Sequence, residues 1–432
     1  MDFPKKSVYF LTLGCKLNQC ESEEVKRKFL ERGYQWVEDP SQAEVAFIST
    51  CAVTTRAEQK SRQAIGNILH INLQAKIVVT GCAVQQYPKA FADIPGVWLL
   101  LGTAERMNPF PALEKRTDSS ISRINPETIS PAAGAPDNRT RAFLKIQDGC
   151  SSACTYCIVP QARGPSRSIP PQVILDAIKK LSESSFQEIV LSGVHIGDYG
   201  RGLEGWNLLR LLDEVEKLRL NCRIRLSSLE PWTITPELIE RVVSNEWICP
   251  HFHIPFQSGS TKILKQMGRP YGRQDLEVIF DTISKHPAVG LGGDVIVGFP
   301  GEEEVDFQET VEFIEKYPFS YLHVFPFSRR PGTKAFDYPQ QNRSAEITRR
   351  AKVLRELGEI KRTKFLASLK GTMQAVIFER TLHKGYWHGV SANYAKIRSK
   401  ETVIQPGIIY SVKITDINSK PITGGVVRKN LQ

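Results

Sequence analysis

The stretch Cys150-Ser151-Ser152-Ala153-Cys154-Thr155-Tyr156-Cys157 carries three cysteines with the spacing C-x3-C-x2-C. Three thiolates at this spacing can hold three corners of a 4Fe–4S cube and leave the fourth iron open for another ligand. A zinc site is the alternative, although structural zinc usually takes four protein ligands. The strand pattern at 141–147 leads into the stretch, so we expect the cysteines on a loop that follows a strand.

The region after this loop alternates between strand and helix patterns. We expect strands at 141–147, 188–191, 223–226, 251–254, 293–297 and 321–325. Helix patterns fall between them, for example at 208–218, 236–244, 273–285 and 303–316. Six such units predict a barrel or partial barrel of the β/α kind, with its functional residues at the carboxyl ends of the strands.

The region before the loop also predicts an α/β domain. Strand patterns at 8–13, 45–49 and 76–80 alternate with helix patterns at about 21–32 and 60–69, which indicates a parallel sheet. Residues 117–138 are rich in Ser, Pro, Ala and Asn without periodicity, which predicts a linker or mobile loop.

Each of the three amino-terminal strands is followed, after one intervening residue, by a cysteine, namely Cys15, Cys51 and Cys82. The carboxyl ends of parallel strands share one edge of a sheet, so we expect these thiols to converge on a second metal site. Three unrelated core cysteines are the alternative. Cys20 is expected at a helix start, as a thiol outside this site.

The positive charge is concentrated at the carboxyl end. The net charge is +11, and residues 343–432 hold 18 Lys and Arg against 6 Asp and Glu. A basic end on a near-neutral body favours binding of a polyanion, above all nucleic acid, whereas a basic surface kept for solubility is the alternative.

The carboxyl end itself predicts a long helix at 343–370 and then a small β-barrel. Strands are expected at 373–379, 395–399, 403–404, 408–414 and 425–428. Three aromatic residues interleave with four cations in this part, namely Tyr386, Trp387 and Tyr394 with Lys384, Lys396, Arg398 and Lys400. Aromatic rings beside cations suit exposed bases and phosphates, although some of these rings must fill the barrel core.

Length and cysteine usage bound the class of protein. The 432 residues suffice for two or three domains, which we place at 6–116, 139–370 and 371–432, with the linker at 117–138 between the first two. The sequence has no apolar run of membrane-spanning length and no basic-then-apolar leader, so we expect a cytoplasmic protein without a membrane partner. Nine cysteines in a reducing compartment favour metal or redox chemistry over disulfides.

The whole chain resembles the methylthiotransferases, a branch of the radical S-adenosylmethionine (SAM) enzymes. The resemblance is carried by Thr12-Leu-Gly-Cys15-Lys-Leu-Asn18, Ser49-Thr-Cys51-Ala-Val-Thr54, Gly81-Cys82, the Cys150–Cys157 stretch, His251-Phe-His-Ile-Pro-Phe-Gln-Ser-Gly259, Asp294-Val-Ile-Val-Gly-Phe-Pro-Gly-Glu302 and Phe325-Pro-Phe-Ser-Arg-Arg-Pro-Gly-Thr333. The carboxyl end is similar to the TRAM domain, a small RNA-binding β-barrel.

The resemblance implies two 4Fe–4S clusters with different tasks. An auxiliary cluster on Cys15, Cys51 and Cys82 would carry or supply sulfur, which one SAM methylates. A second cluster, on Cys150, Cys154 and Cys157, would bind another SAM and cleave it to a deoxyadenosyl radical. That radical removes hydrogen from an unactivated carbon, and the methylthio group takes its place.

We also expect SAM contacts at the carboxyl ends of the barrel strands. The candidates are Gly193 for the methionine amine, Ser227 and Glu230 for the ribose or carboxylate, Gly298 for the adenine, and Arg163 and Arg167 for the SAM carboxylate or a phosphate. Surface ion pairing is the alternative for the two arginines. His251 and His253 share one strand face and are expected to be core histidines rather than ligands.

The residues Cys51-Ala-Val-Thr54 and Lys60-Ser-Arg-Gln63 are most similar to enzymes that add methylthio to carbon 2 of threonylcarbamoyladenosine beside the tRNA anticodon. Ser49 and Phe256 depart from the usual Asn and Leu of the family. The alternatives are the enzymes for isopentenyladenosine in tRNA or for a ribosomal-protein aspartate and, from another class, a non-catalytic metal-containing RNA-binding protein. The implied partners are a tRNA anticodon stem-loop, a flavodoxin-like or ferredoxin-like electron donor and a sulfur source.

Overall fold

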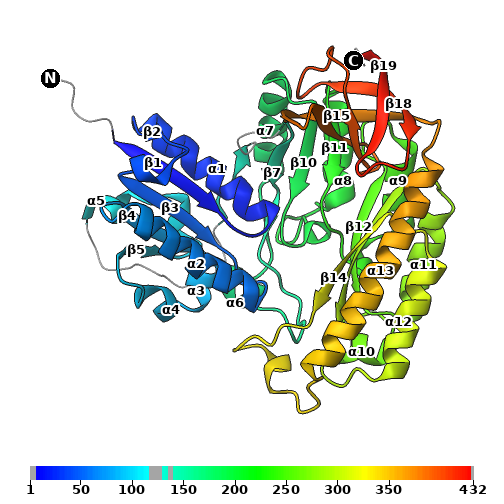
Figure 1. Cartoon of the computed structure of the whole chain (residues 1–432), viewed down its shortest axis with the longest axis horizontal. Coiled ribbons are helices and arrows are strands. Elements are labelled where there is room, and N and C mark those ends of the chain that lie inside the picture. Colours follow the sequence, from blue (N-terminus) through cyan, green and yellow to red (C-terminus); the bar gives the residue numbers. More distant parts are fainter. Residues whose placement is uncertain (1–5, 116–128, 135–139, 430–432) are drawn as a thin grey trace.

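The computed structural model describes residues 6–115, 129–134 and 140–429. The amino-terminal part is a five-stranded parallel sheet in the order β2-β1-β3-β4-β5 (Figure 1). Its strands are β1 (Ser7–Thr12), β2 (Gln35–Trp36), β3 (Val45–Thr50), β4 (Lys76–Gly81) and β5 (Val97–Leu101). Its helices are α1 (Lys16–Glu31), α2 (Thr55–Ile71), α3 (Cys82–Gln86), α4 (Lys89–Ala92) and α5 (Phe110–Lys115). The predicted parallel sheet is therefore confirmed.

Helix α1 begins five residues before the predicted start, with Cys15 as its N-cap. Cys20 consequently lies inside the helix and not at its start. It is fully buried, and its thiol donates a hydrogen bond to the carbonyl of Ala132 at 3.1 Å. Burial raises the pKa of this thiol. Cys20 therefore ties α1 to the central part of the chain.

The central part contains six parallel strands in two sheets. One sheet holds β7 (Ala142–Lys145), β10 (Glu188–Ser192) and β11 (Arg223–Leu226), and the other holds β12 (His251–Gln257), β13 (Gly290–Val297) and β14 (Tyr321–Pro326). The helices between them include α7 (Pro171–Glu183), α8 (Leu208–Lys217), α9 (Pro236–Ser244), α10 (Thr261–Gln266), α11 (Arg273–Ser284) and α12 (Glu304–Lys316). This is the predicted partial β/α barrel, whose two sheets share one apolar core.

The predicted linker lies mostly outside the described residues. Within it, Ala133–Gly134 form the short strand β6, which pairs antiparallel with β7. The backbone N–H of Lys145 also donates to the carbonyl of Ala132 at 2.9 Å. This short segment gains ladder hydrogen bonds that its own sequence pattern does not indicate.

The carboxyl end begins with α13 (Ser344–Ser368), which runs along β14 and α12 (Figure 1). A closed barrel follows in the order β15-β16-β17-β19-β18, as predicted. Its strands are β15 (Met373–His383), β16 (Tyr386–Ser391), β17 (Lys396–Ser399), β18 (Ile409–Asp416) and β19 (Ile422–Lys429). Strand β16 was not expected, and 403–404 form no strand.

Within the described ranges, every helix is too short or too polar to cross a membrane.

Candidate active site

The three amino-terminal cysteines lie at one edge of the parallel sheet. Cys15 follows β1, Cys51 follows β3, and Cys82 follows β4 as the first residue of α3. A Cβ added to Gly14 would lie 2.9 Å from the Cβ and 3.1 Å from the Sγ of Cys51. The loops after β1 and β3 are thus in direct contact, and Gly14, at φ +107°, is the residue that permits it.

These thiols influence one another electrostatically. Burial raises the pKa of Cys51 to about 12, and the nearby thiolates of Cys15 and Cys82 contribute to the rise. A metal centre or a cation beside these sulfurs would compensate negative charge on them. Arg163 supplies one such cation, because its Nε donates a hydrogen bond to the Sγ of Cys82 at 3.2 Å.

The second cysteine set lies on the loop between β8 (Gln147–Asp148) and α6 (Val159–Arg163). The backbone N–H of Cys150 donates to the carbonyl of Gly164 at 3.0 Å, and that of Thr155 donates to Met267 at 2.9 Å. Gly149 has φ +71°, and a Cβ there would lie 2.0 Å from the carbonyl oxygen of Pro165. Backbone contacts on several sides therefore fix the shape of this loop.

Two of the predicted SAM-contact residues have surroundings that suit a ligand. Gly193 lies beside this loop, and Ser227 has a hydroxyl without a hydrogen-bond partner among the described residues. A Cβ on Gly193, just after β10, would lie 2.9 Å from Oε1 of Gln147, whose Nε2 donates to the carbonyl of Gly149 at 2.7 Å. Ser227 follows β11, and its hydroxyl is buried without a hydrogen-bond partner among the residues that the structure describes. An unused buried hydroxyl at a strand's carboxyl end is what a bound polar ligand would satisfy.

Glu230 forms an ion pair beside the second cysteine set. Its Oε2 lies 2.7 Å from Nη1 of Arg269, and Nη2 of Arg269 donates to the hydroxyl of Tyr156 inside the cysteine loop. Burial raises the pKa of Glu230, although Arg269 opposes the rise. Sequence reasoning missed Arg269, because no local pattern marks a residue that contacts Tyr156 from 113 positions away.

The expectation for Arg163 needs correction, whereas a SAM contact of Arg167 stays a prediction. Arg163 lies neither at the surface nor free for SAM, because its guanidinium is buried and pairs with Glu21 at 3.0 Å and Asp148 at 2.8 Å. Its Nη2 also donates to Asn18 at 2.7 Å. Arg167 is half-buried, and its Nη2 donates to the carbonyl of Arg163 at 2.6 Å.

Gly298, the predicted adenine neighbour, contacts helix α13. It has φ +74°, and a Cβ there would lie 2.3 Å from Cγ1 of Ile347. Its N–H donates to Oε2 of Glu302 at 2.7 Å, and Glu302 pairs with Arg350 of the same helix. The structure thus shows Gly298 in the packing of α13 against the end of β13.

Helix α3 and helix α6 pack together and bring the two cysteine sets to one interface. Cys82 begins α3, Cys157 lies just before α6, and Arg163 at the end of α6 contacts Cys82. The side chains of Gln86 and Gln161 add a hydrogen bond of 2.9 Å across the same interface.

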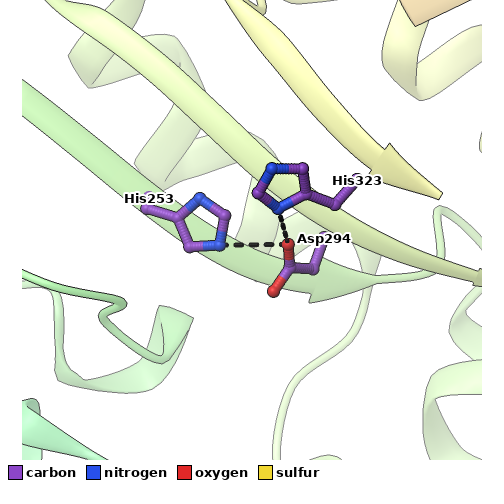
Figure 2. A group of neighbouring side chains, drawn as sticks. All are labelled: His253, Asp294 and His323. Carbon is purple, nitrogen blue, oxygen red and sulfur yellow. Dashed lines mark hydrogen bonds and ion pairs between the residues drawn. The ribbon is translucent and has the colours of Figure 1, made fainter. Parts of the chain in front are cut away.

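A group that the sequence analysis did not identify as a unit lies on β12, β13 and β14. Figure 2 shows the side chains of His253, Asp294 and His323 converging on one carboxylate oxygen. Nε2 of His253 and Nδ1 of His323 each lie 3.0 Å from Oδ1 of Asp294. Alternation along the strands puts all three on one face, so the pairing of strands was the missing information.

Comparisons with known proteins match the amino-terminal part and the central part of the chain. Residues 7–102 match the family described as uncharacterized protein family UPF0004, and residues 144–314 match the radical SAM superfamily. In fold, the chain is similar to the radical S-adenosylmethionine methyltransferase TsrM from Kitasatospora setae, with a TM-score of 0.57 over 77% of each chain at 12% identity.

Curated relatives cover almost the whole chain. It is 37% identical to the threonylcarbamoyladenosine tRNA methylthiotransferase MtaB of Aquifex aeolicus, over 88% of this chain and 95% of the relative. The MtaB of Bacillus subtilis is 36% identical over 94% and 93%. The tRNA-2-methylthio-N(6)-dimethylallyladenosine synthase of Natranaerobius thermophilus is 32% identical over 92% and 89%. The chain therefore belongs to the radical SAM methylthiotransferases, in the group of threonylcarbamoyladenosine tRNA enzymes named MtaB.

Proposed function

We propose that the protein adds a methylthio group to carbon 2 of threonylcarbamoyladenosine beside the anticodon of tRNA. The observation that carries this proposal is the packing of α3, which Cys82 begins, against α6, which follows Cys157, with Arg163 at the end of α6 donating to Cys82. Chemistry that combines a radical source with a sulfur source needs two such centres close together. The higher identity to the MtaB relatives than to the dimethylallyladenosine synthase supports the choice of nucleoside.

The donor geometry favours clusters over zinc. A metal ion needs at least three ligand atoms close together. Among the residues that the structure describes, the ligand atoms of His253, Asp294 and His323 lie within 4.8 Å of one another, whereas neither cysteine set meets this limit. Each cysteine set is therefore spread more widely. Two sulfurs bound to one zinc at about 2.3 Å lie at most about 4.6 Å apart, so a larger centre fits these thiols better.

In this proposal Cys150, Cys154 and Cys157 hold the 4Fe–4S cluster that binds SAM, and Cys15, Cys51 and Cys82 hold the auxiliary cluster. When bound, the first cluster with SAM supplies the radical that removes hydrogen, and the auxiliary cluster supplies the sulfur. Arg163 compensates the negative charge of Cys82, and Arg269 holds Tyr156 and Glu230 beside the second set. The buried hydroxyl of Ser227 and the backbone at Gly193 remain for SAM.

The barrel presents a candidate RNA-binding surface. The ring of Tyr386 lies 4.2 Å from the guanidinium of Arg398 and 4.8 Å from Nζ of Lys400. Lys384 and Lys396 are exposed on the same strands or the turn beside them. This arrangement suits the phosphates and exposed bases of an anticodon stem-loop. An electron donor and a sulfur source complete the proposed partners.

Mass spectrometry of tRNA nucleosides from a strain lacking the gene tests the function. We expect the methylthio derivative of threonylcarbamoyladenosine to disappear and to return with the wild-type gene or with Cys222→Ala, a buried cysteine of the central core. Cys51→Ala should not restore it. Loss of the methylthio derivative of isopentenyladenosine instead would establish the alternative substrate.

The iron content of the purified protein tests the centres. Two 4Fe–4S clusters correspond to about eight iron and eight sulfide per chain, whereas a zinc protein would contain neither. A Cys150→Ala/Cys154→Ala/Cys157→Ala variant should retain about four iron per chain on the amino-terminal set. Loss of all iron from that variant would contradict two independent sites.

A further inference from the structure

The trio of His253, Asp294 and His323 has the spacing of metal ligands. Each imidazole nitrogen lies 3.0 Å from the same Asp294 oxygen, and the three ligand atoms lie within 4.8 Å of one another (Figure 2). Ligands about 2.1 Å from an ion and at right angles to one another lie about 3 Å apart. Two imidazoles and one carboxylate are also a known donor set for divalent transition metals, and they leave coordination positions open.

The surroundings of His253 support a ligand role. Its Nδ1 lies 3.0 Å from the hydroxyl of Tyr321, so Nδ1 can carry the proton and leave Nε2 free for a metal. The same hydroxyl lies 2.9 Å from Nε2 of His251, which can accept its proton. Tyr321 therefore orients the imidazole of His253 as an outer partner of a metal ligand does.

One side of the trio is open to solvent. The side chain of His323 is 55% exposed, whereas those of His253 and Asp294 are 11% and 21% exposed. A metal held here would have buried ligands on one side and free positions on the other. Such a centre binds a ligand from outside the chain and is not closed like a structural zinc site.

Chains of contacts also lead from the trio towards both cysteine sets. On one side, His251 stacks on Tyr394 at 4.6 Å, and Nζ of Lys16, the residue after Cys15, lies 5.7 Å from that ring. On the other side, the carbonyl of His253 accepts a hydrogen bond from the N–H of Leu229 at 3.0 Å, and the next residue, Glu230, pairs with Arg269, which contacts the Cys150–Cys157 loop. In the function proposed above, the substrate nucleoside must enter this region.

We propose that His253, Asp294 and His323 bind a divalent transition metal ion whose open positions receive the carboxylate of the substrate's threonylcarbamoyl group. The second half of this proposal rests on the proposed function. Threonine joined through its amine to a carbamoyl group keeps a free carboxylate and a hydroxyl, both oxygen ligands. The isopentenyl group offers neither. The ion also removes the repulsion that the Asp294 carboxylate would otherwise exert on a second carboxylate.

Binding of Mn²⁺ to the anaerobic holoenzyme tests the site, because free Mn²⁺ has an electron paramagnetic resonance signal that is lost on binding. We expect one Mn²⁺ per chain in the wild type and in His70→Phe, a control at an exposed histidine in the last turn of α2. His323→Phe keeps an aromatic ring against His253 and Phe325 but lacks the nitrogen. It should bind Mn²⁺ at least about tenfold more weakly.

Asp294→Asn provides a second variant of nearly unchanged shape, with the same expected loss. Equal Mn²⁺ binding by wild type, His323→Phe and Asp294→Asn would overturn the metal site, as would no binding by the wild type at millimolar Mn²⁺. These results do not depend on methylthio transfer, so they are separable from a failure of the proposed function.

Equilibrium binding of anticodon stem-loop RNA tests the carboxylate. Mn²⁺ should tighten binding of RNA with threonylcarbamoyladenosine about tenfold in the wild type, and should not do so in His323→Phe. RNA with unmodified adenosine should respond equally in both proteins. An equal effect of Mn²⁺ on the two RNAs in the wild type would overturn carboxylate ligation.

Discussion

Arg163 links Cys82 of the amino-terminal set to Asp148, which lies two residues before the second set. It donates to Cys82, pairs with Glu21 and Asp148, and is itself buried. Glu21 has two further cationic partners, Arg106 and Lys145. The network therefore joins α1, strand β8 just before the second cysteine set, and α6. Its members must be present together, since a buried charge without a partner costs far more than an exposed one.

Replacing Arg163 by Gln should lower the free energy of unfolding by about 3 kcal/mol, because Asp148 and Glu21 each lose a buried partner. The control is Arg201→Gln, whose ion pair with Asp198 involves a side chain that is 56% exposed. That change should cost less than about 1 kcal/mol. Denaturant unfolding of the two variants gives the comparison, and equal shifts of the midpoint would show that the buried network contributes nothing special.

Glu21 makes stability depend on acid pH. Burial alone would raise its pKa, but Arg106, Arg163 and Lys145 outweigh burial and hold the pKa at about 2, below the usual 4.5. A carboxyl with a lowered folded-state pKa stabilises the protein above its unfolded pKa, and that contribution is lost as the pH falls from about 4.5 to about 2. The wild type should thus be more stable than Glu21→Gln at pH 7, and the difference should shrink across this interval. A difference that is constant with pH would refute the assigned pKa.

Among single residues, the sequence predicts those whose role is visible from their neighbours along the chain. The cysteines could be identified because their spacing, or their position after a strand, is visible along the chain. The buried role of Arg163 could not be predicted, since its partner Glu21 is 142 positions away and nothing near Arg163 indicates burial. The trio on β12, β13 and β14 is a similar case, because its members come together only when three strands pair in register.

Helix α13 shows how an element is fixed by a few close approaches. Gly298 leaves room for Ile347, and Gly358 faces Leu322 of β14 at ordinary contact distance. The ion pair between Glu302 and Arg350 also holds α13 against the loop after β13. The sequence predicted this helix by its composition, and β13 and β14 by their apolar runs. The sequence did not predict that Gly298, the residue after β13, allows α13 to pack closely against the end of that strand.

Gly298→Ala should therefore destabilise the protein by about 2 kcal/mol, because it combines a positive φ with a Cβ placed 2.3 Å from Ile347. Gly66→Ala on α2 is the matched change, since nothing lies within 4 Å of the added Cβ. A helical alanine there should stabilise by up to about 1 kcal/mol. Thermal unfolding should show opposite shifts, and a gain in stability for Gly298→Ala would contradict the packing argument.

The errors among the elements have physical causes. Strand β16 lies outside the predicted strands, and of the aromatic residues beside cations it is Trp387 that packs against the barrel core. Tyr394 likewise contacts His251 and Tyr321 of the central part rather than lying on a free RNA surface. An aromatic residue next to a cation can either pack in a core or lie on an RNA-binding surface. The sequence does not distinguish these two roles, because they depend on how the barrel closes.

At the scale of the whole molecule, the barrel is tightly joined to the central part. Buried Arg223 and Arg225 share Glu188 and donate to barrel carbonyls, Arg223 to Ala375 at 2.9 Å and Arg225 to Ser391 at 3.0 Å. The sequence suggests a separable domain from 371 onward. Removing that segment would expose two arginines and a glutamate of β10 and β11, so deletion would disturb the catalytic part along with RNA binding.

Surface substitutions are the better test of RNA binding. Replacing Lys384, Arg398 and Lys400 by Gln removes two cations at the Tyr386 ring and one in the turn beside it, at the cost of one hydrogen bond from Arg398 to Thr423. Each lost phosphate contact reduces the slope of log affinity against log salt by about 0.7 to 0.9, so the slope should become shallower by about 2. Filter binding of the anticodon stem-loop at several salt concentrations measures both affinity and slope.

The matched control neutralises Lys179, Lys180 and Lys217, which are exposed on α7 and α8, and so removes the same charge from another face. If the barrel positions the RNA, the control should keep most of the affinity and slope, because exposed charges beyond about 10 Å from a phosphate are largely screened at 0.1 M salt. Cleavage of SAM without RNA should be unchanged in both triple variants, since none of the six residues contacts the cysteine sets. Equal weakening by the two variants would mean that net charge alone attracts the RNA and that specific recognition lies elsewhere, in the amino-terminal sheet or the partial barrel.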